Sequence, residues 1–504
     1  MAHEIGTASD LEDMFGKIVN FLTTDATLVA QGQAWEVLRL RRDNLAGITT
    51  NINESTAATA VRKIAHTFRY DPRTLNTNSR VNADSVFTAS GFVAGSSYFR
   101  VQMKQAREVK TIRLKCGPSG YQNNMPRSFR LQYSDNGTSW TTALTVTNAT
   151  AFQQDERRDF AVPGTPGAHL YWQIIIDALQ SGTTLGWSEF LMLQSDGTVA
   201  NHFGSEVILK ARGNSGLDEI FTGIRSEYDA ALGWYNLFMN GYVGYDANEP
   251  SWFLQPGALP GPEASYPRAV PMVPLWNAAM PYWFVASGRS FRFAVKVSTN
   301  YEGGYLGFFL PYATPNQYPY PLAVGGSLVP TDGSRSTQWR YSYVHERHGV
   351  FPGPGGTSTN NSEGGDSALY MRTADGKWGL VSNRPDSSSA GSESVYPPSQ
   401  SSFIPFTPSG NWRCVWPHAV ITSGTNTPLR PFRECLGGGY MMLPCIILQR
   451  GPYTAAWGEL EGTYNISGFQ NAAENTTTYN GKTHVVFQNA YRNAISEFWA
   501  LSLD

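Results

Sequence analysis

The stretch from Arg127 to Trp140, RSFRLQYSDNGTSW, constrains the fold more than any other part of the chain. Its first half places Phe129, Leu131 and Tyr133 at alternate positions, which puts them on one face of an extended strand. The Ser-Asp-Asn-Gly sequence that follows contains residues that tolerate the positive φ angles of a tight turn. The chain then continues in extended form beyond Trp140, so the stretch predicts a β-hairpin.

Composition favours the same kind of structure along the whole chain. The 504 residues include 13% aromatic and only 15% charged residues, with 49 glycines and 30 prolines. Soluble domains ordinarily contain roughly 25% charged residues. Strands and turns use aromatic residues, glycine and proline more readily than long helices do. We therefore predict a mainly β, multi-domain protein, and this length suits roughly two to four domains.

Charge and cysteine content argue against several partners and compartments. The formal net charge is −2 and no basic segment stands out, so we expect no nucleic-acid partner. No apolar run approaches the ~18 residues of a membrane span, so none is predicted. The four cysteines, Cys116, Cys414, Cys435 and Cys445, lack the spacing of a metal site. They indicate buried thiols of a protein made in a reducing cytoplasm, with a disulfide from Cys435 to Cys414 or Cys445 as the alternative.

Residues 1–82 are expected to form a separate N-terminal docking module of small α+β type. Ser9 and Glu12 have the spacing of a capping box, which predicts that a helix starts there. Apolar residues then recur at helical spacing and form one stripe along a helix over residues 10–23. One helix cannot bury this stripe alone, so it packs either on its own chain or on a neighbouring subunit. We expect that removing residues 1–80 leaves the other domains folded.

Residues 83–196 combine the hairpin with a second strand-rich stretch, from His169 to Leu193. Together the two stretches resemble the discoidin family, also called the coagulation-factor type C family, at Ser128–Trp140, Leu170–Ile176 and Leu185–Leu193. The resemblance implies a galactose-binding-like β-sandwich, or jelly roll, that recognises a surface and does not catalyse a reaction. Strands are expected near residues 98–104, 109–116, 127–134, 139–146, 170–177 and 187–194. The two cysteines that often bracket the family are absent here.

The resemblance also implies where a ligand would bind, because loops at one end of the sandwich carry binding in this family. The best candidate loop is Tyr121, Gln122, Asn123 and Asn124, immediately before the signature strand. Amide groups can form bidentate hydrogen bonds with sugar hydroxyls, and an aromatic ring can stack on a sugar ring. A cluster of Asn residues that only forms a turn is the alternative. Discoidin-like domains bind sugars, lipids or proteins, or act as spacers, so the ligand class stays open.

Residues 197–504 are expected to form a large β-rich domain. Residues 291–298 alternate apolar with mostly polar side chains, which predicts a half-buried strand. A short helix is expected around residues 226–240. Residues 352–402 are rich in Gly, Ser, Asn and Pro, which predicts long loops. Loops of this kind often carry recognition.

The segment from Pro281 to Ser327 resembles a recurrent domain of tailed-bacteriophage virion proteins, specifically of tail and baseplate components. The N-terminal LEDMFGKIVNFL and AWEVLR segments look similar to such proteins as well. This resemblance implies a structural protein of a tail tip or baseplate, a homo-oligomer with other tail proteins as partners. Its location would be the virion, after synthesis in the cytoplasm of the host bacterium. The discoidin-like module would serve host attachment or fibre mounting, and the N-terminal module would anchor the protein.

Common catalytic motifs are missing from the sequence. No P-loop, Gly-x-Ser-x-Gly elbow or His-Glu-x-x-His motif occurs, and His345 and His348 fall on opposite faces of a predicted strand. We therefore predict no enzyme activity, no cofactor and no metal site; a structural calcium ion stays open, since discoidin-like sandwiches often hold one. The alternatives are a carbohydrate-binding adhesin that contacts host polysaccharide directly and, after it, a polysaccharide depolymerase, which needs two suitably spaced carboxylates.

Overall fold

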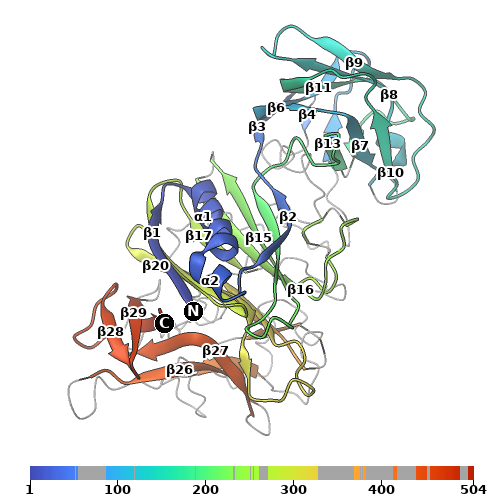
Figure 1. Cartoon of the computed structure of the whole chain (residues 1–504). Helices are drawn as coiled ribbons and strands as arrows, with labels where there is room; N and C mark the ends of the chain where they lie inside the picture. The colour runs from blue at the N-terminus through green and yellow to red at the C-terminus, as the bar shows by residue number, and fades with distance from the viewer. Residues whose placement is uncertain are drawn as a thin grey trace, which may run out of the picture. The chain divides into compact units, whose positions relative to one another are not determined.

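The chain forms two compact units in which strands predominate, and this confirms the predicted mainly β, multi-domain fold. Unit 1 contains Met1–Arg39 together with the chain from Val207 onward, and unit 2 is Leu40–Glu206 (Figure 1). The computed structural model describes residues 1–51, 53–54, 87–117, 120–187, 189–230, 233–249, 251–253, 255–259, 271–326, 368–374, 376, 378–381, 412–416, 439–450, 455–488 and 498–504.

The two units divide the chain differently from the predicted boundaries after residues 82 and 196. Residues 1–39 do not form a separate module, because strand β1 (Ala2–Ala8) pairs antiparallel with β18 (Met280–Ala286) along its whole length. This pairing places the N-terminal segment in the same unit as the C-terminal part of the chain. Unit 2 is therefore an insertion into unit 1, between Arg39 and Val207.

Unit 1 contains three sheets. The first sheet has the order β1, β18, β19 (Ser290–Val297), β20 (Asn300–Phe308), β22 (Leu322–Gly326), β23 (Ala368–Arg372) and β24 (Trp378–Val381). The second has the order β17 (Met272–Leu275), β16 (Trp234–Tyr242), β15 (Ile220–Asp229), β14 (Glu206–Ala211) and β2 (Glu36–Arg41). The third has the order β25 (Trp412–Trp416), β26 (Met442–Arg450), β27 (Ala455–Ile466), β30 (Phe498–Ser502), β29 (Lys482–Gln488) and β28 (Thr476–Tyr479), with β21 (Leu310–Pro311) paired to β27.

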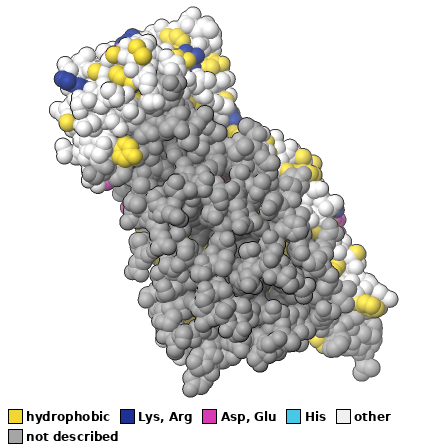
Figure 2. Space-filling model, turned by 180° about the vertical axis from the view of Figure 1, so that it is seen from behind, with side chains coloured by type: hydrophobic (Ala, Val, Ile, Leu, Met, Phe, Trp, Pro, Cys, Tyr) yellow, Lys and Arg dark blue, Asp and Glu magenta, His cyan; other side chains and the backbone are white. Residues whose placement is uncertain are grey.

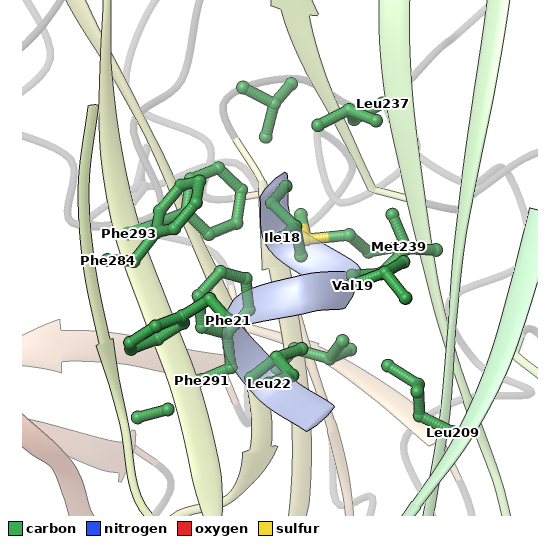
Figure 3. Packing of buried hydrophobic residues seen from close by; sticks show 14 of the residues in the cluster. Ile18, Val19, Phe21, Leu22, Leu209, Leu237, Met239, Phe284, Phe291 and Phe293 are labelled. Carbon is green, nitrogen blue, oxygen red and sulfur yellow. The ribbon is translucent and has the colours of Figure 1, made fainter. Parts of the chain in front are cut away.

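Helix α1 (Leu11–Thr24) packs between the first and second sheets (Figure 3). Its apolar stripe, which includes Ile18, Phe21 and Leu22, is buried. Phe284, Phe291 and Phe293 of the first sheet approach the helix from one side, and Leu209, Leu237 and Met239 of the second approach it from the other (Figure 3). The stripe therefore packs on its own chain, which decides between the two alternatives left open by the sequence. The short helix α2 (Ala26–Ala30) follows directly.

The cap of helix α1 lies one residue later than the predicted capping box. Asp10, rather than Ser9, is the N-cap residue, and its carboxylate accepts a hydrogen bond from the backbone N–H of Asp13 at 2.8 Å. The Asp13 carboxylate in turn accepts from the backbone N–H of Ser9 at 2.8 Å. Glu12 accepts a hydrogen bond from the Ser226 hydroxyl instead of reaching back to the helix end. An acidic side chain satisfies the free N–H groups and favours the positive end of the helix dipole.

Strand β19 is buried on both faces, so the prediction of a half-buried strand is wrong. Phe291 and Phe293 face the core that contains α1. The opposite face is covered by the third sheet, where Ala294 belongs to a second apolar core that contains Phe487 and Trp499. The first sheet is thus the middle of three stacked sheets.

Burial of the second face of β19 brings Arg292 into the protein interior, where it is 0% exposed. Its Nη1 atom lies 2.9 Å from the Ser290 hydroxyl and 3.4 Å from a Glu461 carboxylate oxygen. The guanidinium also contacts the sulfur of Met1. An arginine on a strand can therefore be an interior residue when a carboxylate from another sheet supplies its counter-charge.

The helix predicted around residues 226–240 is absent, and this prediction is wrong. Residues 220–229 form β15 and pair antiparallel with β16, from Phe221 opposite Tyr242 to Asp229 opposite Trp234. Cross-strand aromatic pairs of this hairpin, such as the stacked Tyr228 and Tyr235, fit a pleated surface better than a helix.

Unit 2 is a sandwich of a five-stranded and a three-stranded sheet with a further short three-stranded sheet. The five-stranded sheet has the order β3 (Leu45–Thr50), β6 (Ser97–Glu108), β11 (Ala168–Leu179), β8 (Pro126–Ser134) and β9 (Thr141–Val146). The other two have the orders β10 (Arg157–Ala161), β7 (Thr111–Lys115), β13 (Glu189–Leu193) and β12 (Leu185–Trp187), β5 (Phe87–Ser90), β4 (Asn53–Glu54). Every strand predicted for this part of the chain is present, and β3, β4, β5, β10 and β12 are additional.

We predict that Phe21→Ala lowers the free energy of unfolding of unit 1 by about 3–5 kcal/mol, because the buried ring leaves a cavity between two sheets. Hydrogen exchange of the β18 and β19 amides measures this loss, and amides of unit 2 provide the internal reference. The control Ile5→Ala removes a side chain that is 55% exposed and is expected to cost less than about 0.5 kcal/mol. Equal effects of the two substitutions would contradict this role of α1.

A second prediction concerns acid. Burial alone would raise the pKa of Glu461, but the Arg292 charge and hydrogen bonds from serine hydroxyls lower it below its ordinary value of 4.5. A lowered folded-state pKa contributes stability that is present above pH 4.5 and is lost as pH falls through the folded-state pKa. Glu461→Gln should therefore remove this loss of stability at acid pH. It should also cost about 3–5 kcal/mol at neutral pH, since Arg292 loses its counter-charge.

Hydrogen exchange of the β19 and β27 amides at several pH values tests this prediction. Glu459→Gln changes a carboxylate of the same strand that accepts from the exposed Tyr312 hydroxyl, and it serves as the matched control. The same pH profile for both variants would refute the role given to Glu461.

Candidate functional site

The signature hairpin of unit 2 forms as predicted between β8 and β9. The Ser134 hydroxyl accepts from the backbone N–H of Gly137 at 2.9 Å, and the Asn136 side chain accepts from the N–H groups of Thr138 and Ser139, each at 2.9 Å. Gly137 has a φ of +72°, which a residue without a side chain adopts at no steric cost. These hydrogen bonds hold the turn locally, and the Asp135 carboxylate also contacts Nδ1 of His169 in β11 at 2.8 Å.

The candidate loop lies at one end of the sandwich, and the chain enters and leaves the sandwich at the other. β8 begins beside Leu179 at the end of β11, so the loop before β8 is at this end. The N-terminal segment of unit 2 instead meets the far ends of the strands, where Asn44 Nδ2 donates to the carbonyls of Gln105 at 3.2 Å and Ala200 at 2.8 Å. Within unit 2, the loop is thus remote from both chain connections.

A short 3-10 turn, η1 (Gln122–Asn124), gives the candidate loop its shape. The Tyr121 carbonyl accepts from Asn124 N–H at 3.0 Å, and the Gln122 side chain accepts from Gly120 N–H at 3.0 Å. The Asn123 carbonyl accepts from the N–H of Gly182 at 2.9 Å. A second loop, after β11, therefore supports the first.

The two loops approach so closely that Gly182 has no room for a side chain. A Cβ atom there would lie 2.6 Å from the Asn124 side-chain oxygen and 3.0 Å from the Asn123 carbonyl oxygen. The backbone beneath the candidate residues is consequently fixed by the fold. The fully buried Met125 anchors the next position.

Two side chains of the candidate loop, Tyr121 and Asn123, keep their hydrogen-bonding capacity. Asn123 is exposed, while Tyr121, Gln122 and Asn124 are half-buried. Within the described part of the chain, neither the Tyr121 hydroxyl nor the Asn123 amide has a hydrogen-bond partner. The structure thus brings the four predicted residues together on one turn. The Asn123 carbonyl is used within the fold, as the alternative of a turn-forming Asn cluster implies. The Tyr121 hydroxyl and the Asn123 amide remain available to a ligand.

Near this end of the sandwich, Glu189 is a buried acid that the sequence did not single out. Its side chain is 0% exposed, and one carboxylate oxygen lies 3.3 Å from the Nε atom of Arg157. Burial raises the pKa of Glu189, and the charges of Arg157, Arg113 and Lys115 offset only part of this effect. The only signal in the sequence is its place at the start of an apolar strand, EFLML. Burial therefore makes Glu189 a weaker acid than an exposed glutamate.

Metal ligands, membrane-spanning helices and cysteines are the remaining features that bear on chemistry. The described part of the chain contains no group of three His, Cys, Asp or Glu residues that could hold a metal ion. None of its helices is long and apolar enough to cross a membrane. Cys116 and Cys445 are buried, and burial raises the pKa of Cys116 to about 11 and of Cys445 to about 12. The disulfide alternatives involving Cys435, the histidine pair at 345 and 348, and most of the loops around 352–402 lie outside the described residues.

Figure 2 shows one face of the sandwich at the top of the view. Hydrophobic side chains there form small separate groups, with Lys and Arg side chains among them. This arrangement suits a surface that meets water more than one that is buried against an apolar partner.

Comparison with known families finds a match within this sandwich. The family model described as the F5/8 type C domain matches residues 54–170, which supports the predicted discoidin-like domain and extends it toward the N-terminus. The match stops before β12 and β13, although these strands pair with β5 and β7 of the same unit. No curated protein matches the chain in sequence.

Three solved carbohydrate-binding modules are similar to part of the chain. One is CBM32-1 from a family 31 glycoside hydrolase of Clostridium perfringens (13% identity, 30% of this chain and 95% of that chain, TM-score 0.21). Another is the family 32 module from C. perfringens NanJ in complex with galactose (13%, 28% and 89%, TM-score 0.21). The third is CBM62 from Clostridium thermocellum Xyl5A (16%, 31% and 98%, TM-score 0.21). Identities and TM-scores at this level say nothing about the ligand of this chain.

The raised pKa of Glu189 predicts a pH dependence of stability opposite in sign to the one predicted for Glu461. Since the folded state binds the Glu189 proton more tightly, the contribution of Glu189 to the stability of unit 2 is fully present below pH 4.5 and is lost as pH rises through the raised pKa. Glu189→Gln should remove this loss. Hydrogen exchange of the β7 and β13 amides, corrected for intrinsic rates, measures the slope. Glu108→Gln, which removes a surface carboxylate of the same unit, should keep the wild-type slope; a wild-type slope in Glu189→Gln would disprove the assignment.

Proposed function

We propose that the protein is a structural component of a bacteriophage tail tip or baseplate and that unit 2 is its recognition module for glycans on the host surface. One observation carries the recognition part of the proposal. The loop that contains Tyr121 and Asn123 is held rigidly by its backbone, keeps its side-chain polar groups open, and lies at the end of the sandwich opposite both chain connections. A module attached in this way can expose the loop to a large ligand.

The architecture of unit 1 supports the structural part of the proposal. Its three stacked sheets bury large aromatic cores and offer a scaffold that holds an inserted module by two neighbouring strands, β2 and β14. The resemblance of residues 281–327 to phage tail and baseplate proteins gives the biological setting. The apolar stripe of α1 is buried inside unit 1, so we do not assign the anchoring role to it. Assembly contacts must use other surfaces of the unit.

A direct adhesin is the second candidate, because the same loop could bind host polysaccharide without any tail partner. Light scattering of the purified chain, with and without tail proteins, separates the two candidates. A defined oligomer, or one that forms only with tail proteins, supports the assembly component. A monomer that ignores tail proteins favours the adhesin.

The glycan-binding prediction is tested with the double variant Gln122→Ala, Asn123→Ala in the full chain. Each amide supplies hydrogen bonds of about 0.5–1.5 kcal/mol, so we expect affinity for a neutral glycan to fall roughly tenfold. A glycan array identifies the ligand, and isothermal titration calorimetry measures its affinity. Gln154→Ala removes an exposed amide outside the loop and should leave the affinity unchanged. Unaltered binding by the double variant would show that the ligand binds elsewhere.

A further inference from the structure

The outer face of the five-stranded sheet in unit 2 carries an arrangement that the candidate loop does not explain. Tyr98 and Arg100 of β6 point to this face, since the intervening Phe99 is fully buried in the core. Trp140 comes from the start of β9, which β11 and β8 separate from β6 in the sheet. The Arg100 guanidinium carbon nevertheless lies 4.5 Å from the centre of the Trp140 ring and 4.8 Å from that of Tyr98. The two side chains reach toward each other across the sheet.

A row of amide side chains lies beneath this contact. Nε and Nη2 of Arg100 donate to the Gln173 side-chain oxygen at 3.2 and 3.1 Å. The Gln173 amide donates to the Gln132 side-chain oxygen at 2.8 Å, and Gln132 donates to the Thr142 hydroxyl at 3.1 Å. Each of these residues is directly opposite the next in the strand register. The row fixes the orientation of the guanidinium, so its position is set before any ligand arrives.

The charge of Arg100 has no carboxylate partner in the described part of the chain. On the same sheet, Arg130 is paired with Asp177 at 2.8 Å and Lys104 with Asp43 at 2.5 Å. Arg100 is also only half-buried, and its Nη1 atom makes no hydrogen bond to the described residues. A planar guanidinium with open N–H groups is the group that binds a carboxylate most specifically.

The two aromatic rings beside Arg100 complete the chemistry of the surface. Trp140 and Tyr98 are half-buried, and their ring N–H and hydroxyl groups have no partner within the described residues. Aromatic rings pack against the apolar faces of sugars, while ring N–H and hydroxyl groups can bond the sugar hydroxyls. We propose that Tyr98, Arg100 and Trp140 form a binding surface for an acidic saccharide, with Arg100 bound to the sugar carboxylate. Gln173 and Gln132 hold the guanidinium in position for this contact. This surface is separate from the loop of residues 121–124 and does not depend on that loop.

The test uses the full chain and oligogalacturonate as the probe, together with the same oligosaccharide after reduction of its carboxyl groups to alcohols. Arg100→Gln should weaken binding of the acidic form about tenfold, because one charge-assisted contact is lost. It should leave binding of the reduced form within about twofold. Trp140→Ala should weaken binding of both forms, because the ring contacts the sugar itself. Binding of the acidic form should also decline with added salt.

Arg107→Gln is the matched control, since Arg107 is another arginine of β6, and its guanidinium donates to the Gln105 side chain at 2.8 Å. Its affinity for the acidic form should stay within about twofold of wild type. Equal losses in Arg107→Gln and Arg100→Gln would indicate unspecific charge attraction and overturn the proposal. A wild-type chain that binds both forms equally, or neither, would overturn it as well. If the double variant Gln122→Ala, Asn123→Ala loses affinity for the acidic form and Arg100→Gln does not, the acidic sugar binds at the loop. That result would refute the sheet surface but not the glycan-binding loop.

Discussion

The pairing of β1 with β18 is the interaction on which unit 1 depends. It joins the first residues of the chain to the middle of the sequence, and it delivers helix α1 into the space between two sheets. His3 Nδ1 also lies 2.9 Å from the carbonyl oxygen of Leu503, so the two termini meet in the same unit. Without the first 24 residues, apolar side chains of both sheets would lose their packing partner. The buried position of α1 therefore argues against the expectation that the rest of the protein folds without residues 1–80.

Local patterns in the sequence predict local structure well. The hairpin at residues 134–137 is held mainly by the side chains of Ser134 and Asn136, and the stripe of α1 follows from helical spacing, so the sequence predicts both. The burial of Arg292 could not, because its counter-charge, Glu461, is 169 residues away. The candidate loop was found through its amide side chains, whereas its support by Gly182 depends on a close approach between two loops. The sequence places Trp140 in the second half of the hairpin, and only the fold shows its contact with Arg100.

Unit 2 places two kinds of polar chemistry on one scaffold. The loop at its end offers neutral amide and hydroxyl groups on a rigid backbone, while the outer face of its larger sheet offers one uncompensated cation between aromatic rings. The inner face of that sheet, by contrast, is wholly apolar at Phe99, Trp172 and Ile174. Because side chains alternate along a strand, each strand of this sheet contributes one set of residues to the core and the other set to the outer surface.

The insertion of unit 2 into unit 1 has a consequence for synthesis on the ribosome. β1 and α1 emerge first, but their partners in the first sheet begin only at Met280. At translation rates of roughly 5–20 residues per second, the apolar helix waits on the order of tens of seconds for those partners. During this delay the sandwich has been made in full, whereas the helix still exposes Phe21 and Leu22. The nascent chain is therefore prone to aggregation at the apolar stripe of α1, which is where a chaperone would act.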